Sequence, residues 1–153
     1  MKKFDIIIIG AGLYVCGKGT SGYGTILPAI FEWKRHNKNI GDIHCVSTSA
    51  KSSKEVLQKV KGLEVKTGIK VDVKTYPEND LRNHDAYKEV LKKCKNPGCA
   101  IIAVPDHLHH QIAKDCLQEG FHTLLVKPLT PTTKEGLDLV KTAKINNLYG
   151  AVE

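Results

Sequence analysis

Arginine is scarce in this sequence: Arg35 and Arg82 are the only arginines among its 23 basic residues. Proteins that read nucleic acids use arginine for bidentate contacts to bases and phosphates, and no block of like charge here exceeds a few residues. We therefore expect no nucleic-acid partner. The formal net charge of +7, almost all from lysine, is better matched to a small anionic ligand such as a nucleotide.

Long apolar runs are also missing, which limits where the protein can work. No stretch approaches the roughly 20 apolar residues that a membrane span needs, and Asp5 interrupts any signal-like apolar start. We expect a cytoplasmic protein with no membrane partner. Its 153 residues, 41% of them hydrophobic, are enough for one globular domain with a sizeable core.

The cysteines and histidines form no recognisable metal pattern. The five cysteines are odd in number, and the closest pair, Cys94 and Cys99, has no matching second pair. This usage predicts reduced thiols and no zinc site. His107, His109 and His110 lie close together, but no acid or cysteine joins them at ligand spacing. We therefore predict no metal site.

Apolar runs of strand length alternate with helical patterns along the chain, without an internal repeat. Unbroken apolar runs such as the first are typical of parallel strands that helices cover on both faces. The alternation predicts a doubly wound α/β fold, with a six-stranded, mainly parallel sheet, the first strand central and a ligand beyond the carboxyl ends. The predicted strands are residues 4–9, 43–47, 69–76, 100–104, 123–126 and 148–152.

Recognisable end signals and apolar faces predict the helices between these strands. Residues 52–55 and 132–135 have capping-box spacing, Asp106 can cap a helix that Gly120 ends, and a further helix starts near Thr25. Apolar residues at helical spacing predict buried faces at Val56, Val60 and Leu63, at Leu108, Ile112 and Cys116, and at Leu137 and Val140.

Glycines gather directly after the first strand. Gly10 and Gly12 match the start of a dinucleotide fingerprint, in which glycine permits a tight turn and close approach of a pyrophosphate. Val15 stands where a third Gly or Ala is usual, and the loop that follows is long. The match is therefore weak by itself.

The same loop also fits other nucleotide-binding arrangements. Gly12, Gly17 and Lys18 reproduce most of a P-loop, although Gly19 occupies the place of the hydroxyl residue that would hold Mg²⁺. The loop alone favours a dinucleotide. A P-loop phosphotransferase or ATPase and a non-catalytic nucleotide-binding module are the alternatives.

A more specific pattern lies in the second half, after the predicted strand 100–104. It consists of Pro105, His109, Glu119, Gly120, His122, Lys127 and Pro128. At these positions the sequence resembles the Gfo/Idh/MocA family of NAD(P)-dependent oxidoreductases. Asp106 and Val126 depart from the family's usual Asn and Glu. The resemblance covers essentially residues 1–153 as the family's N-terminal dinucleotide-binding Rossmann domain.

This resemblance implies hydride transfer between a nicotinamide cofactor, NADP or NAD, and a sugar, cyclitol or related hydroxyl or carbonyl substrate. It implies that the C-terminal substrate domain is absent from this chain, which alone would be inactive, and that the full-length protein is a homo-oligomer. Lys127 is the implied catalytic residue, beside the substrate oxygen. The implied cofactor contacts are Gly10, Gly12, Leu13, Tyr14, Thr48, Ser49, Val104, Pro105, His109, Lys127 and Pro128.

The end of the second strand bears on which dinucleotide is bound. NAD-specific domains usually place an acid there, which binds the ribose 2′-hydroxyl and repels a 2′-phosphate. Here Thr48 stands nearest to that place, followed by Ser49 and Lys51. Hydroxyl groups and a lysine can accept a phosphate, so we predict NADP(H) over NAD(H).

Overall fold

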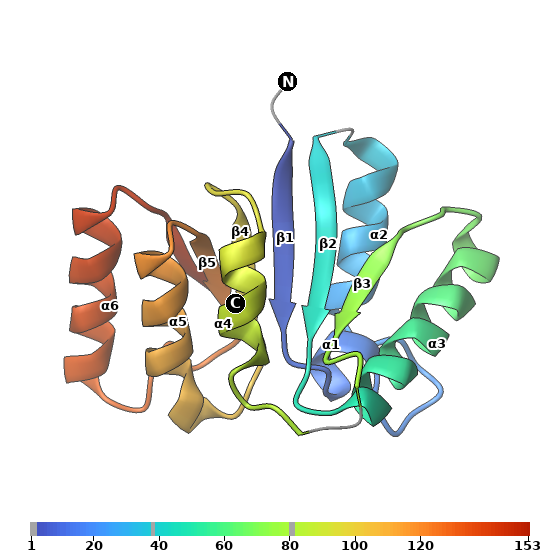
Figure 1. The fold of residues 1–153 in the computed structure, drawn as a ribbon, viewed down its shortest axis with the longest axis horizontal. Helices are drawn as coiled ribbons and strands as arrows, with labels where there is room; N and C mark the ends of the chain where they lie inside the picture. The colour runs from blue at the N-terminus through green and yellow to red at the C-terminus, as the bar shows by residue number, and fades with distance from the viewer. Residues whose placement is uncertain (1–2, 38, 80–81) are drawn as a thin grey trace.

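The computed structural model describes residues 3–37, 39–79 and 82–153 as a twisted sheet with helices on both faces (Figure 1). Neighbouring strands are all parallel, in the order β3-β2-β1-β4-β5-β6. This arrangement confirms the predicted doubly wound α/β fold with the first strand central. The strands are β1 (Phe4–Ile9), β2 (Ile40–Val46), β3 (Val73–Tyr76), β4 (Cys99–Ile102), β5 (His122–Leu125) and β6 (Gly150–Val152).

The first three helices pack on one face of the sheet and the last three on the other. They are α1 (Leu13–Cys16), α2 (Ile26–His36), α3 (Ala50–Thr67), α4 (Ala86–Lys93), α5 (His109–Gln118) and α6 (Thr133–Ile145), with a 3₁₀ turn at Asp106–Leu108 before α5. Within the described ranges, no helix combines the length and the apolar character needed to cross a membrane.

Strand β1 joins the two halves of the core because both of its faces are covered. Ile6 and Ile8 belong to the core under the first helix layer, and Ile7 and Ile9 to the core under the second. Successive strand residues point to opposite faces, so both sets must be apolar. This explains the unbroken run of isoleucines and brings the carboxyl end of β1 to the middle of one edge of the sheet (Figure 1).

Two of the three predicted helix caps are wrong. Helix α3 begins a turn earlier than predicted, because the Ser49 hydroxyl accepts the Ser52 N–H at 3.4 Å. Asp106 lies in the 3₁₀ turn, and Leu108 is the N-cap of α5. The capping box of Thr132 and Glu135 at the start of α6 is confirmed.

Tertiary packing also overrides part of the predicted core. Val56, Val60 and Leu63 are buried as predicted, whereas Leu137 is 66% and Val140 46% exposed. Helix α6 instead buries the face of Gly136, Leu139 and Thr142. Helical spacing identifies faces on α6, but only its placement against the sheet decides which one is covered.

Some predicted boundaries also shift, and two helices, α1 and α4, were not predicted. Strand β3 covers only the last four residues of the predicted 69–76, and β2 starts three residues before the predicted 43–47. Helix α4 packs Tyr87, Val90 and Leu91 into the second core, and its first turn borders the candidate site.

Candidate functional site

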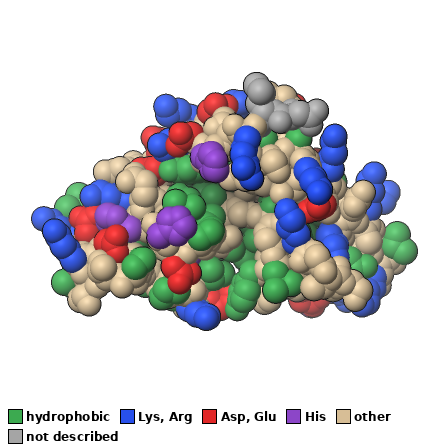
Figure 2. Space-filling view, turned by 90° about the horizontal axis from the view of Figure 1, so that it is seen from below, with side chains coloured by type: hydrophobic (Ala, Val, Ile, Leu, Met, Phe, Trp, Pro, Cys, Tyr) green, Lys and Arg blue, Asp and Glu red, His purple; other side chains and the backbone are tan. Residues whose placement is uncertain are grey.

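A cleft of about 450 Å³ opens at the carboxyl ends of β1, β2 and β4. Figure 2, which views the molecule from below, shows this edge hollowed near its centre. The chain leaves β1 and β4 toward opposite faces of the sheet, and a crevice forms where the winding reverses. The volume is typical of a small-molecule site. The cleft therefore lies where the sequence predicted a ligand.

Two glycines after β1 are needed for different reasons. Gly10 has a φ of +120°, and a Cβ there would overlap the carbonyl oxygen of Ala103, so the fold itself requires glycine. Gly12 has an ordinary φ of −87°, and among the described residues a Cβ there would meet nothing within 4 Å. Gly12 lines the cleft. The packing of the protein therefore does not require glycine at position 12. The absence of a side chain there lets a ligand approach the backbone closely.

The long glycine loop after α1 is fastened to α3. Lys59 donates from its Nζ to the carbonyl oxygens of Thr20 and Gly22, at 2.7 and 2.5 Å. The same ammonium lies 5.5 Å from the centre of the Tyr23 ring. These contacts hold the loop at the β2 end of the cleft.

Lys18 is the loop residue that enters the cleft. Its Nζ donates to the Ser52 hydroxyl at 2.9 Å and lies 3.3 Å from Glu55 Oε2. Lys18, Ser52 and Thr48 all line the cleft beside the end of β2. In the sequence analysis, Lys18 is the lysine of a possible P-loop. The strand order, together with this reach toward α3, favours the dinucleotide interpretation of the loop.

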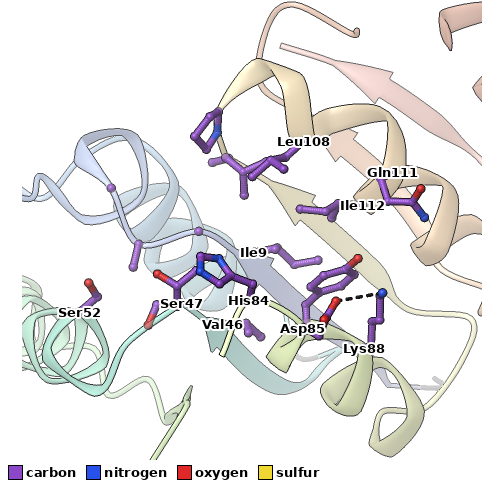
Figure 3. Close-up of a pocket in the computed structure, with 18 of the residues that line it drawn as sticks. Ile9, Val46, Ser47, Ser52, His84, Asp85, Lys88, Leu108, Gln111 and Ile112 are labelled. Carbon is purple, nitrogen blue, oxygen red and sulfur yellow. Dashed lines mark ion pairs between the residues drawn. The ribbon is translucent and has the colours of Figure 1, made fainter. Parts of the chain in front are cut away.

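The far wall of the cleft comes from α4 and its approach (Figure 3). Lys88 forms an ion pair with Asp85 at 2.9 Å, and the Tyr87 hydroxyl donates to Asp115 at 2.6 Å. Burial raises the pKa of Tyr87, and the bond to Asp115 raises it further, so the hydroxyl remains a donor at neutral pH. Sequence reasoning missed this wall. The amphipathic spacing of the apolar residues in α4 is the sequence pattern that could have predicted it.

Five of the eleven predicted cofactor contacts line the cleft: Gly10, Gly12, Thr48, Val104 and Pro105. Leu13 and Tyr14 turn their side chains outward, 60% and 42% exposed. Their backbone positions are still relevant, because the first N–H groups of a helix have no partner within it. Ser49 caps α3.

His109 lies behind the wall of the cleft and is fully buried. Its Nδ1 is 2.7 Å from the carbonyl oxygen of Pro128, and its Nε2 is 2.9 Å from that of Val104. Each bond needs an N–H at that nitrogen, so the neutral ring makes one and the protonated ring both. The ring ties the segment after β4 to the segment after β5. Both ring nitrogens of His109 are thus directed at backbone carbonyl oxygens of the cleft wall.

Lys127 and Pro128 follow β5, one strand beyond the cleft. Both are exposed, and the Lys127 N–H donates to the carbonyl oxygen of Glu153 at 3.0 Å. The backbone is thereby held by the segment after β6. Lys127 follows the carboxyl end of β5, at the same edge of the sheet as the cleft, and is not part of the described cleft lining.

The thiols are poor candidates for nucleophiles. All five cysteines are free. Burial raises the pKa of Cys45 to about 12 and that of Cys99 to about 11. A thiol that stays protonated at neutral pH is a weak nucleophile, so the chemistry of this site does not rest on cysteine.

Known proteins with similar sequences identify the family of this chain. The profile of the oxidoreductase family with an NAD-binding Rossmann fold, Gfo/Idh/MocA, matches residues 4–152. The chain belongs to this family. An uncharacterized oxidoreductase of Schizosaccharomyces pombe is 36% identical over 53 residues, which are 35% of this chain and 14% of that protein. The resemblance inferred from the second-half motifs is confirmed.

Solved structures of similar fold include other oxidoreductases. The WlbA dehydrogenase of Chromobacterium violaceum, solved with NADH and UDP-GlcNAcA, gives a TM-score of 0.60 at 18% identity, over 100% of this chain and 35% of that one. The biliverdin reductase of Synechocystis, solved with biliverdin and NADP+, gives 0.63 at 18% identity, over 97% and 37%. This Gfo/Idh/MocA chain therefore spans about a third of the length of these two relatives.

Proposed function

We propose that this chain is the cofactor-binding domain of an oxidoreductase that transfers hydride between a nicotinamide dinucleotide and a hydroxyl or carbonyl carbon. The observation that carries the proposal is the open backbone at Gly12, in a cleft at the switch point of a 3-2-1-4-5-6 sheet. Packing within the protein does not require the absence of a side chain at Gly12, whereas close approach of a pyrophosphate to the backbone would require it. The residues present therefore fit the dinucleotide that the family binds.

Each part of the cleft would hold a different part of the cofactor. The backbone from Gly12 to Tyr14 offers N–H groups to the pyrophosphate. Thr48 and Ser52, beyond β2, face the adenosine side, and the segment after β4 at Val104 faces the nicotinamide side. When bound, the nicotinamide ring supplies or accepts the hydride.

Lys127 is the proposed catalytic residue. It stands after β5, next to the nicotinamide side of the cleft, where an ammonium can exchange a proton with a substrate oxygen. A substrate domain carried elsewhere in the full-length protein would complete this site. The UDP-GlcNAcA in the WlbA structures favours a sugar-type substrate here as well. The free thiols support a cytoplasmic location.

The class of cofactor is tested by titrating the chain with NADPH, NADH and Mg-ATP and following intrinsic or cofactor fluorescence. We expect saturable binding of a dinucleotide and no turnover by this chain alone. Mg-ATP should bind weakly, if at all, and dinucleotide should displace it. Saturable Mg-ATP binding that neither dinucleotide competes with would overturn the proposal in favour of the P-loop alternative.

The preferred dinucleotide is NADP(H), and the structure adds Lys18 to the residues that support this choice. No acid follows β2 directly, since residues 47–49 are Ser, Thr and Ser. The Lys18 ammonium meets the Ser52 hydroxyl in the same corner of the cleft. A cation and hydroxyl groups suit a 2′-phosphate, and Glu55 holds the lysine ready for it.

Lys18→Met should therefore weaken NADPH binding about tenfold, or about 1.4 kcal/mol, and leave NADH binding nearly unchanged. The change removes one charge and keeps most of the side-chain volume. Lys61→Met is the matched control, because Lys61 is exposed in the middle of α3 and outside the described lining of the cleft. Direct binding of both cofactors to both variants decides the point. If the Lys18 variant keeps its NADPH affinity, or if the Lys61 variant loses as much, the assignment of Lys18 is wrong.

A further inference from the structure

On the face of the sheet that α4 covers, near the start of β1, three potential metal ligands meet from three different elements. Asp5 is near the start of β1, His44 is in β2 and Cys94 is the C-cap of α4. One carboxylate oxygen, one ring nitrogen and the Sγ atom all lie within 4.8 Å of one another. Asp5 and His44 are buried, and Cys94 is partly buried. We propose that Asp5, His44 and Cys94 form a binding site for a divalent transition-metal ion of the Zn²⁺ class.

The donor set selects this class of ion. Zn²⁺ takes sulfur, imidazole nitrogen and carboxylate oxygen in tetrahedral sites, whereas Mg²⁺ and Ca²⁺ prefer oxygen alone. Three protein ligands leave one position for water. The carboxylate and the thiolate together balance the charge of a divalent ion.

Neighbouring groups hold two of the ligands in place. The Asp5 carboxylate accepts the N–H of Asp42 at 3.0 Å on Oδ1 and that of Lys95 at 2.9 Å on Oδ2. Each oxygen retains a further lone pair for a metal. His44 Nδ1 is 3.3 Å from the Tyr76 hydroxyl, and the two rings stack with centroids 5.8 Å apart. Donation from Nδ1 to this hydroxyl leaves Nε2 as the metal ligand, an arrangement common around bound zinc.

The surrounding charges do not prevent cation binding. The Lys74 ammonium acts on the charges of His44 and Cys94, but it is paired with the Asp42 carboxylate at 2.8 Å. Lys95 contacts Asp5 through its backbone N–H. Close ligand spacing in the sequence does not reveal this cluster, because the three residues come together only when β1, β2 and α4 pack.

The site is tested by titrating the chain with Co²⁺, because a cobalt–thiolate bond produces an intense near-ultraviolet charge-transfer band. We expect one Co²⁺ per chain and displacement by Zn²⁺. Cys94→Ser should abolish the band, and His44→Gln should weaken Co²⁺ binding tenfold or more. The matched controls Cys99→Ser and His107→Gln, which change residues outside the cluster, should bind Co²⁺ like the unmodified chain.

A second measurement needs no variant and so does not depend on whether the variants fold. X-ray absorption of the Zn²⁺-loaded unmodified chain should show one sulfur neighbour at about 2.3 Å, with nitrogen and oxygen ligands completing the shell. Zn²⁺ should also raise the melting temperature, and a chelator should reverse the rise. The absence of a cobalt band in the unmodified chain, a band that survives Cys94→Ser, or a zinc shell without sulfur would each overturn the proposal.

Discussion

Replacing Gly12 by valine should abolish dinucleotide binding and leave the chain folded. The new side chain has room in the protein, since a Cβ at this position meets no described atom within 4 Å. It would extend into the cleft and occupy the space that we propose for the pyrophosphate. We expect the dissociation constant for NADPH to rise at least 100-fold, or about 2.7 kcal/mol. Fluorescence titration and a thermal melt of the same sample measure the two effects.

Gly10→Ala is the contrasting control. Its Cβ would overlap the Ala103 carbonyl oxygen, and its φ of +120° disfavours any side chain, so this change should destabilise the fold itself, by about 2 to 3 kcal/mol. The two variants thus separate a turn residue from a ligand-contact residue. A Gly12→Val chain that melts normally and still binds NADPH with unchanged affinity would contradict the placement of the pyrophosphate.

Lys127→Ala should slow hydride transfer by the full-length enzyme on the order of 10²-fold or more, which is the usual scale for a positioned acid–base group. The effect should fall on kcat, because Lys127 lies outside the lining of the cleft among the described residues and adds little to cofactor affinity. In the chain studied alone, the same change should leave NADPH binding intact. Steady-state kinetics of the full-length protein and titration of the chain provide the two readouts.

Lys134→Ala serves as the matched control for this experiment. Lys134 is also exposed, but it lies in the first turn of α6 and outside the described cleft lining. Its removal should change neither turnover nor binding. If Lys127→Ala leaves turnover unchanged while Lys18→Ala abolishes nucleotide binding, the catalytic assignment is wrong and the P-loop interpretation gains support.

The sequence was sufficient to predict the architecture because the relevant signals are local. The isoleucine run of β1 and the apolar run of β4 indicate strands buried on both faces, and their alternation with helices predicts parallel order. Gly10 and Gly12 follow β1 directly, so their place at the edge of the sheet comes from chain connectivity. The second-half motifs identified the family, which the profile match over residues 4–152 confirms.

Tertiary packing decided which side chains meet in the cleft. Lys18 reaches Ser52 across the loop, and His109 turns inward to two carbonyl groups although its motif resembles that of a cofactor contact. Helix α4 adds a cleft wall that the sequence analysis did not predict. Periodicity describes one element at a time and contains no information on what that element packs against.

By itself, therefore, the sequence determined the strands, the parallel order, the glycine turn after β1 and the family. Only the tertiary structure decided that α6 buries Leu139 and leaves Leu137 exposed, and that Asp5, His44 and Cys94 converge. The physical reason is that apolar periodicity and turn residues are properties of neighbouring positions in the sequence, whereas contacts between distant residues depend on how whole elements pack against one another.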